Sequence, residues 1–353
     1  MKKHSRPAAP GNRMSAGALV VFAILSAPLA QGNEWTRFRG PNGQGISNAD
    51  TIPIKWTEKD YNWKVTLPGV GHSSAVVWAD KVFVTGADQQ AGRGIVAALN
   101  VSDGKTLWVS EYELPPYRMN SLNSYATATP VVDANRVYSL WPTPQATILV
   151  ALDHAGKEAW KRTFGGVHCQ HGAGSSPTVL DDIVVFTHEH ENGDKPEHSA
   201  WIAVDCKTGR TRWELERQTS PKTSYSTPCV YQPAAGTPQL IFTSLAHGMT
   251  GVDPRTGTVV WEAKSAFISR VISSPVIAGP ALDRLIGTCG DASSGKRLVA
   301  IRPGTGDKST EPTQVYKIDS GSVSYIPTPH GHGGPAVHVS RYWVRLLPSQ
   351  CNR

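Results

Sequence analysis

Residues 203–213 read Ala203-Val204-Asp205-Cys206-Lys207-Thr208-Gly209-Arg210-Thr211-Arg212-Trp213. Variants of this phrase cover residues 98–108, 151–160 and 251–261. Trp63 upstream and Tyr316 downstream match the final tryptophan of the phrase. These final aromatic residues follow one another at intervals of 45 to 55 residues. Self-similarity at such a regular interval is typical of a repeat architecture.

A second phrase opens each repeat unit. It has five complete copies and a weaker sixth, at residues 73–77, 128–132, 175–179, 226–230, 273–277 and 326–329. A short apolar run separates the two phrases, as in Ile183-Val184-Val185-Phe186. Each unit therefore reads as four short strands separated by turns.

The repeated aspartates, glycines and tryptophans have structural explanations. Aspartate can hydrogen-bond the turn backbone, and glycine supplies the positive φ of a tight hairpin. A tryptophan one strand later is large enough to fill the space between neighbouring sheets. We therefore assign structural roles to Asp153, Asp205 and Asp253, to Gly104, Gly156, Gly209 and Gly257, and to Trp63, Trp108, Trp160, Trp213 and Trp261.

Four strands repeated about every fifty residues predict an all-β fold, a β-propeller of four-stranded blades. Five complete units cover residues 70–111, 125–165, 172–217, 224–264 and 271–319. Trp63-Lys64-Val65-Thr66 reads as the outermost strand of a blade shared between the chain ends, with its other strands expected from a sixth unit that starts at Ser324.

The phrase Ala-x-Asp-x-x-Thr-Gly-x-x-x-Trp resembles the repeat of quinoprotein propellers, the PQQ-like repeat family. The opening Trp35-Thr36-Arg37-Phe38-Arg39-Gly40-Pro41-Asn42-Gly43-Gln44-Gly45 resembles the start of exported members of that group. The resemblance covers about residues 35–329 and implies the propeller fold. It leaves function open, since the same repeat builds alcohol dehydrogenases and the propeller scaffold of outer-membrane protein assembly.

We divide the chain into a signal peptide (1–32), an N-terminal extension with the WxxFRGPNGxG motif (33–60), the propeller (61–329) and an irregular tail (330–353). The resemblance implies the seven or eight blades that are typical of the superfamily, so the chain is short for such a ring. The tail lacks the Asp-x-x-Thr-Gly phrase. Either the last blade is irregular, or the sequence is a fragment or altered reading frame of a longer protein, which we favour.

The charge balance argues against nucleic-acid binding. The formal net charge is +7, but four positive charges lie in residues 1–32, and the rest are well mixed with acids. The basic start, the apolar run from Ala16 to Leu25 and Ala30-Gln31-Gly32 predict a cleaved signal rather than a membrane anchor, because the run is too short for a span. We expect an exported protein, periplasmic or extracellular, without a transmembrane segment in the mature chain.

Candidate ligand residues precede the opening phrases, where propeller loops reach the mouth of the central funnel. Five of the six are rings and one is a cation: His72, Tyr125, His171, Tyr225, Arg270 and Tyr325. Loop packing is the alternative explanation. His188 and His190 share a face of an extended strand and are weak metal candidates, but such histidines are more often a solvated rim.

Three functions are weighed. The first is a non-catalytic exported propeller that binds a protein or envelope component, with no cofactor expected. The second is a dehydrogenase that uses PQQ and calcium, with Trp141 or Trp201 against the quinone; the resemblance implies adjacent cysteines beneath the cofactor, and no two of the five cysteines are adjacent. The third is a carbohydrate-binding propeller, on the aromatic rings near the axis. We favour the first.

Overall fold

The structure is a computed structural model. It describes residues 34–49, 51, 53–192, 198–279, 281–291, 293, 295–305, 311–331, 337–339 and 344–346. The chain divides into two compact units, residues 1–31 and residues 32–353. The predicted signal peptide, residues 1–32, lies outside the described residues. No helix of the described part is long and apolar enough to cross a membrane.

The five complete units predicted from the sequence each form one four-stranded antiparallel sheet. The first sheet contains β1 (Val76–Trp78), β2 (Lys81–Asp88), β3 (Arg93–Asn100) and β4 (Thr106–Glu113). The second contains β5 (Val131–Val132), β6 (Arg136–Pro142), β7 (Thr147–Asp153) and β8 (Glu158–Phe164). The third contains β9 (Thr178–Leu180), β10 (Ile183–His188), β11 (Ser199–Asp205) and β12 (Thr211–Arg217).

The fourth sheet contains β13 (Cys229–Tyr231), β14 (Gln239–Ser244), β15 (Gly248–Val252) and β16 (Val259–Ala263). The fifth contains β17 (Val276–Ala278), β18 (Arg284–Gly290), β19 (Lys296–Arg302) and β20 (Thr313–Asp319). A two-stranded sheet follows, with β21 (Val337–Val339) and β22 (Val344–Leu346). Three short 3₁₀ helices are η1 (Pro41–Gly43), η2 (Glu58–Asp60) and η3 (Lys264–Ala266).

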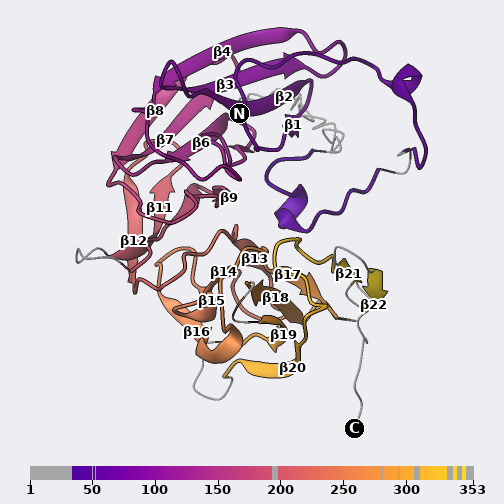
Figure 1. Cartoon of the computed structure of the whole chain (residues 1–353), viewed down its shortest axis with the longest axis vertical. Helices are drawn as coiled ribbons and strands as arrows, with labels where there is room; N and C mark the ends of the chain where they lie inside the picture. The colour runs from indigo at the N-terminus through magenta and orange to yellow at the C-terminus, as the bar shows by residue number, and fades with distance from the viewer. Residues whose placement is uncertain are drawn as a thin grey trace, which may run out of the picture. The chain divides into compact units, whose positions relative to one another are not determined.

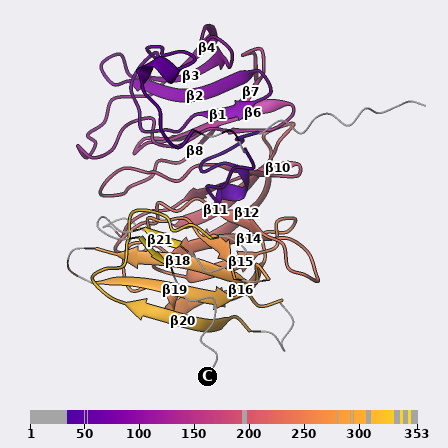
Figure 2. The same cartoon turned by 90° about the vertical axis from the view of Figure 1, so that its right-hand side faces the viewer.

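The sheets follow one another in chain order (Figures 1 and 2). In each sheet the strands pair in sequence order, so the first strand lies at one edge and the fourth at the other. Figure 1 shows β1, β9, β13 and β17 toward the middle and β4, β12, β16 and β20 toward the outside. This arrangement is the propeller architecture predicted from the repeat.

The hydrophobic core lies between successive sheets. One cluster joins Tyr138 of the second sheet to Phe186 of the third, and another joins Phe83 of the first to Trp141 of the second. Two further clusters join the third sheet to the fourth and the fourth to the fifth. Because the second, third and fourth sheets each bury both faces against neighbouring sheets, their central strands are apolar almost throughout, as in β11.

The repeat phrase builds the same turn and the same contact in successive blades. Asp205 Oδ1 accepts from the amide of Thr208 (2.8 Å), and Gly209 completes the turn with φ +68°. Trp160, from the preceding blade, lies against Gly209 and donates its indole Nε1–H to the carbonyl oxygen of Cys206 (2.9 Å). The pairs Trp108–Gly156 and Trp213–Gly257 have the same arrangement.

Trp63 makes this contact as well. Its indole Nε1–H donates to Val101 O (2.7 Å), and its ring lies against Gly104 of the first sheet. Trp63 therefore occupies the position, relative to the first sheet, that a tryptophan on the outermost strand of a preceding blade would occupy. Within the described residues, however, the segment from Trp63 to Thr66 belongs to no strand.

Candidate functional site

Five of the six candidate ligand residues lie in the loops that enter the innermost strands, and Tyr325 follows the fifth sheet. His72 is exposed, and its amide donates to Ala126 O (3.0 Å) beside Tyr125. Asn123 Nδ2 donates to His171 O (2.7 Å), which links the second loop to the third. The loops thus form one continuous surface across the blades.

Two of the six residues, Tyr225 and Arg270, are in contact, and a third, His171, is close enough to feel the charge of Arg270. Arg270 is buried, with its guanidinium 5.8 Å from the ring centre of the half-buried Tyr225. His171 lies in the same electrostatic environment: burial and the positive charge of Arg270 lower its pKa, which Glu191 partly offsets. Tyr225 and Arg270 therefore join the loops of the fourth and fifth blades.

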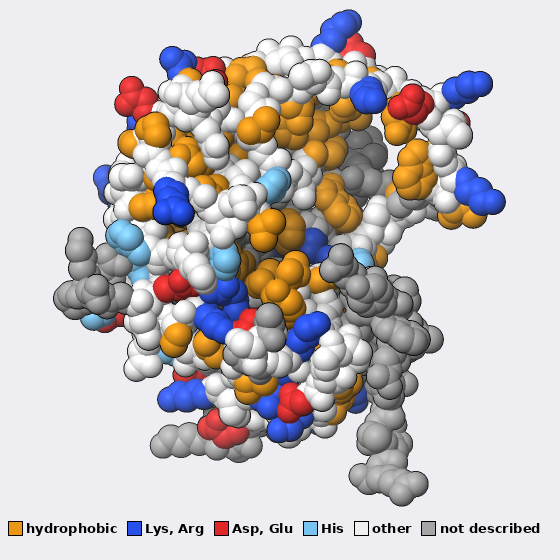
Figure 3. Space-filling model, in the orientation of Figure 1, with side chains coloured by type: hydrophobic (Ala, Val, Ile, Leu, Met, Phe, Trp, Pro, Cys, Tyr) orange, Lys and Arg blue, Asp and Glu red, His pale blue; other side chains and the backbone are white. Residues whose placement is uncertain are grey.

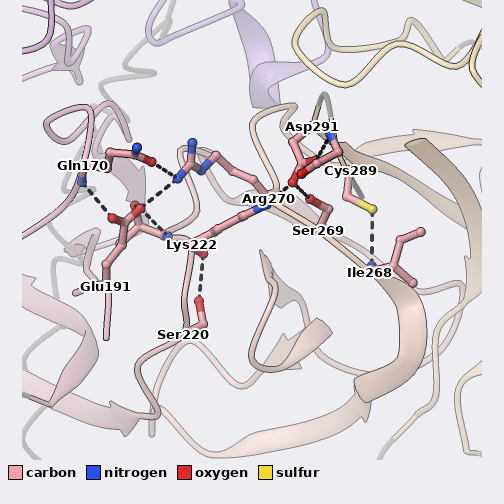
Figure 4. Close-up of polar contacts among 11 residues, drawn as sticks. Gln170, Glu191, Ser220, Lys222, Ile268, Ser269, Arg270, Cys289 and Asp291 are labelled. Atoms are coloured by element: carbon pink, nitrogen blue, oxygen red, sulfur yellow. Dashed lines mark hydrogen bonds and ion pairs between the residues drawn. The ribbon is translucent and has the colours of Figure 1, made fainter. Parts of the chain in front are cut away.

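Arg270 is held by partners from the third blade (Figure 4). Its Nη2 donates to Glu191 Oε1 and to Gln170 Oε1, each at 3.0 Å. Glu191 accepts further hydrogen bonds from the amides of Gln170 (2.8 Å) and Thr223 (3.2 Å). The carboxylate thus ties three loops together, and the buried cation has its counter-ion inside the protein.

A second ion pair lies next to the first (Figure 4). Lys222 of the fourth blade is paired with Asp291 of the fifth. Ser269 Oγ donates to Asp291 Oδ2 (2.5 Å), and Ser293 donates to Oδ1 of the same carboxylate. We call Gln170, Glu191, Lys222, Tyr225, Arg270 and Asp291 the mouth cluster; it holds two cations and two carboxylates that offset one another.

Two further predicted rings, Tyr125 and Tyr325, are also engaged by the protein. Tyr125 is stacked on Tyr117 with ring centres 4.2 Å apart, and its hydroxyl bonds the backbone of Tyr117. Tyr325 has the Lys296 ammonium 5.9 Å from its ring centre. The fold does not gather these rings into one aromatic surface: Tyr125 belongs to the second blade's loop, and Tyr325 follows the fifth sheet.

His188 and His190 share a face, as the sequence predicts, with ring centres 5.0 Å apart. They are buried rather than solvated, at 9% and 5% exposure. The Nε2 atom of His188 lies 2.9 Å from the carbonyl oxygen of Gly165. In the described part of the chain, no group of three or more His, Cys, Asp or Glu side chains is arranged to hold a metal ion.

Glu189, between these histidines, is half-buried. It accepts from the indole Nε1–H of Trp201 (2.9 Å) and the amide of Ser224 (3.3 Å). Burial raises its pKa to about 7, although both donors and the charge of Arg217 act in the opposite direction. The adjoining cavity, lined also by Cys169 and Ala173, has a volume of only about 10 Å³.

Larger hollows lie away from the mouth cluster. One of about 310 Å³ lies beside Pro233–Thr237, Gln239 and the turn at Asp253. Another, of about 150 Å³, lies between the first sheet and residues 67–71. The described cysteines, Cys169, Cys206, Cys229 and Cys289, are all free thiols, three of them buried.

An exposed apolar stretch precedes the first sheet. In Figure 3, hydrophobic side chains are visible at the surface of the upper half of the molecule, where Figure 1 shows the first sheet. The exposed members of the stretch, which we call the apolar segment, are Ile54, Trp56, Tyr61, Val65, Leu67 and Val70. Exposed tryptophan and tyrosine side chains are enriched at interaction sites.

Sequence reasoning identified Arg270, Tyr225 and His171 but missed Glu191, Lys222 and Asp291. Glu191 ends the run His188-Glu189-His190-Glu191, in which the pattern indicated only the histidines, as candidate metal ligands. Lys222 comes four residues before an opening phrase, and Asp291 follows β18. The sequence does show charged residues near several unit boundaries, which could have suggested a charged cluster. No local pattern in the sequence, however, indicates which of these charges form pairs.

A family model described as outer membrane protein assembly factor BamB matches residues 23–140 and 92–324. The crystal structure of BamB from Moraxella catarrhalis is similar over 79% of this chain and 72% of that chain, with 18% identity and a TM-score of 0.48. A europium-containing methanol dehydrogenase is similar over 87% and 81% of the two chains, with 10% identity and a TM-score of 0.48. A search of curated proteins found no match.

Proposed function

The chain belongs to the family of the outer membrane protein assembly factor BamB, and on this premise we propose that it is an exported, non-catalytic propeller that binds a protein or another envelope component. Export rests on the basic start and apolar run within residues 1–32. The partner is a macromolecule in this proposal, because four of the six candidate ligand residues, Tyr125, Tyr225, Arg270 and Tyr325, are engaged by the protein's own side chains.

The state of the mouth cluster carries the proposal. Arg270 is paired with Glu191, and Lys222 with Asp291, so that neither cation is left for an anionic ligand. A pocket for a small molecule usually encloses several hundred Å³ with a few free polar groups. The hollow that adjoins this region is about 10 Å³.

The residues weighed for a quinone do not fit one. Trp201 is fully buried, stacked on Phe242 with ring centres 4.1 Å apart, and has the Arg217 guanidinium 4.4 Å from its ring centre. Trp141 is fully buried against Tyr112 and Gly94. Neither ring has a face open to a planar cofactor, and we derive no step through PQQ or calcium.

Carbohydrate binding finds equally little support at the funnel mouth. Sugar recognition by aromatic residues needs a ring face that is accessible to the ligand. Tyr125 is stacked on Tyr117, Tyr225 packs against Arg270 and Tyr325 against Lys296. These pairings favour the explanation by loop packing.

The apolar segment is our candidate for the partner surface. Ile54 and Trp56 are 93% and 62% exposed, and Val70 is 69% exposed. Tryptophan and tyrosine are enriched at protein interfaces, where they supply large contact areas. A macromolecular partner is therefore expected to cover Trp56 and Tyr61.

The decisive experiment begins with the protein from Asn33 onward, titrated with PQQ and calcium. Quinone fluorescence and a dye-linked assay with alcohols and sugars are followed together. We expect a folded protein by circular dichroism that neither binds the quinone nor turns over. Saturable binding with turnover would overturn the proposal.

The partner surface is tested by photo-crosslinking in the cell envelope. A photoreactive residue at position 56 is expected to cross-link to one defined envelope component. The matched control places the same residue at Lys207, which is exposed on a turn of the third blade. Equal cross-linking patterns from both positions would count against the apolar segment.

A further inference from the structure

Residues 35–45, which we call the hub segment, lie along the innermost strands of the propeller and contact them at a repeated position. The last residue of each complete opening phrase is Val77, Val132, Val179, Val230 or Ile277. All five belong to an innermost strand, whose inner edge has no further strand of its sheet beside it. The hub segment hydrogen-bonds the backbone of four of these five residues.

The first two blades are contacted through the backbone of the segment. Trp35 and Val77 exchange two hydrogen bonds, from Trp35 N to Val77 O (3.1 Å) and from Val77 N to Trp35 O (2.8 Å). The amide of Val132 donates to Thr36 O (2.9 Å). The segment thus begins as a short addition to the innermost strands, a recognised mode of peptide binding.

The fourth and fifth blades are contacted through side-chain amides. Asn42 Nδ2 donates to Val230 O (2.6 Å), and Val230 N donates to Asn42 Oδ1 (2.7 Å). In the next blade, Ile277 N donates to Gln44 Oε1 (2.8 Å). The two side chains therefore replace the backbone groups that a neighbouring strand would provide at equivalent positions.

Two arginines add contacts to carbonyl oxygens. Arg37, 4% exposed, donates through Nη2 to Pro228 O, two residues before Val230. Burial lowers the pKa of this guanidinium to about 10. Arg39 donates to Pro329 O (3.2 Å), which follows the fifth sheet. Carbonyl oxygens from separate blades thus converge on one short segment.

The shape of the segment depends on its glycines. Gly40 has φ +68°, and a Cβ there would lie 2.4 Å from the Trp35 ring. The turn that follows directs Asn42 and Gln44 toward successive blades, with Gln44 Nε2 also donating to Asn42 O (2.8 Å). Beyond the hub segment, the described residues 47, 48, 51 and 53–62 are solvent-exposed. The segment is therefore bound at the hub and connected to the blades by an exposed linker.

We propose that the hub of this propeller is a peptide-binding site and that its ligand is the chain's own residues 35–45. The hub binds this segment through the backbone of one equivalent residue in each of four blades. The site recognises an extended peptide that has arginine and carboxamide side chains and a glycine turn. This role is separate from the proposed envelope partner and does not depend on it. The segment joins blades that are far apart in the sequence.

The test converts the segment into a separate peptide within the folded protein. A protease site is inserted after Lys55 in the exposed linker of the chain from Asn33, and the cleaved protein is passed over a gel-filtration column. We expect the fragment that contains residues 33–55 to stay with a body of monomeric size. The readout is retention of this fragment, so it is independent of any partner or cofactor.

Two variants show whether these side chains hold the fragment. Asn42→Ala combined with Gln44→Ala removes the hydrogen bonds to Val230 and Ile277. We expect the fragment to dissociate from the body about tenfold faster for each of the two blades to which it is no longer hydrogen-bonded. Asn42→Asp, which keeps the size but replaces the Nδ2 donor with a carboxylate oxygen that faces Val230 O and adds a negative charge, serves if the double variant does not fold. The control is Asn48→Ala, at an exposed position just beyond the segment.

Three results would overturn the proposal. The first is immediate loss of the fragment from the parent protein while the body keeps its circular dichroism and melting temperature. The second is equal retention in the parent and in the Asn42 and Gln44 variants. The third is retention only in a dimer, because the ligand would then belong to a second copy.

Discussion

The backbone amide of Ser274 donates to the hydroxyl of Thr328 (N to Oγ1, 3.1 Å). Ser274 belongs to the fifth opening phrase and Thr328 to the weak sixth one. The same contact joins each earlier phrase to the next, in the pairs Ser74–Thr129, Thr129–Ser176, Ser176–Thr227 and Thr227–Ser274. The series of hydroxyl contacts therefore continues past the fifth sheet to the predicted start of a sixth unit.

Substitution of Thr227 tests the contribution of this series. Thr227→Val keeps the side-chain size but removes the acceptor of the Ser176 amide (3.0 Å), and both residues are buried. A buried amide without a partner costs about 1–3 kcal/mol, so we expect the free energy of unfolding to fall by that amount. Urea denaturation followed by tryptophan fluorescence measures it. Thr227→Ser, which keeps the hydroxyl, is the control, and an equal loss in both variants would contradict the explanation.

The contact between Trp160 and Gly209 predicts a larger effect. In Gly209→Ala the new Cβ would lie 2.8 Å from the indole ring, at a residue with φ +68°. We expect a loss of about 2–4 kcal/mol in the free energy of unfolding, from overpacking together with backbone strain. Gly236→Ala separates the two causes, because φ there is also positive while the nearest atom is 3.7 Å away. Similar losses in both variants would assign the effect to the backbone alone.

Most of the blade structure was predictable because each position of the repeat phrase has a local reason. Gly209 supplies a positive φ, Asp205 caps its own turn, and Trp160 fills the space beside the next blade. These interactions depend on residues that lie close in sequence or one repeat away. Regular spacing in the sequence is therefore sufficient to locate the five sheets.

The mouth cluster and the hub segment were less predictable because their partners are distant in sequence and not periodic. Arg270 and Glu191 are 79 residues apart, and Asn42 and Val230 are 188 apart. Whether such groups meet depends on how separate blades are arranged in space. The sequence predicts Arg270 near the axis, but it does not predict the carboxylate from the third blade, Glu191, that is paired with it.

The ion pair of Glu191 and Arg270 is tested by a double-mutant cycle. Arg270→Ala leaves a carboxylate, 15% exposed, without its counter-ion, and Glu191→Ala leaves a largely buried guanidinium. We expect each to lower the free energy of unfolding by about 2–3 kcal/mol, and the double variant to lose less than the sum by about 1–3 kcal/mol. Additive losses would show that the two groups do not stabilise each other.

Glu189 predicts a pH dependence of stability with a definite sign. Its pKa rises from 4.5 to about 7 in the folded protein, so the unfolded state loses this proton first as the pH increases. The folded state is therefore penalised progressively between pH 4.5 and 7, by about 3 kcal/mol once both states are ionised. Glu189→Gln is neutral at every pH and keeps an acceptor for the Trp201 indole.

The measurement is the difference in unfolding free energy between the parent protein and Glu189→Gln from pH 4.5 to pH 8. Taking this difference removes contributions common to both proteins, including that of His247. Burial lowers the pKa of His247, and its contribution to stability is lost as the pH falls below 6.5. We expect the unfolding free energy of the glutamine variant to increase relative to that of the parent protein as the pH rises. A difference that stays constant across the range would mean that the Glu189 carboxyl titrates normally in the folded protein, which its burial beside Trp201 and Ser224 makes unfavourable.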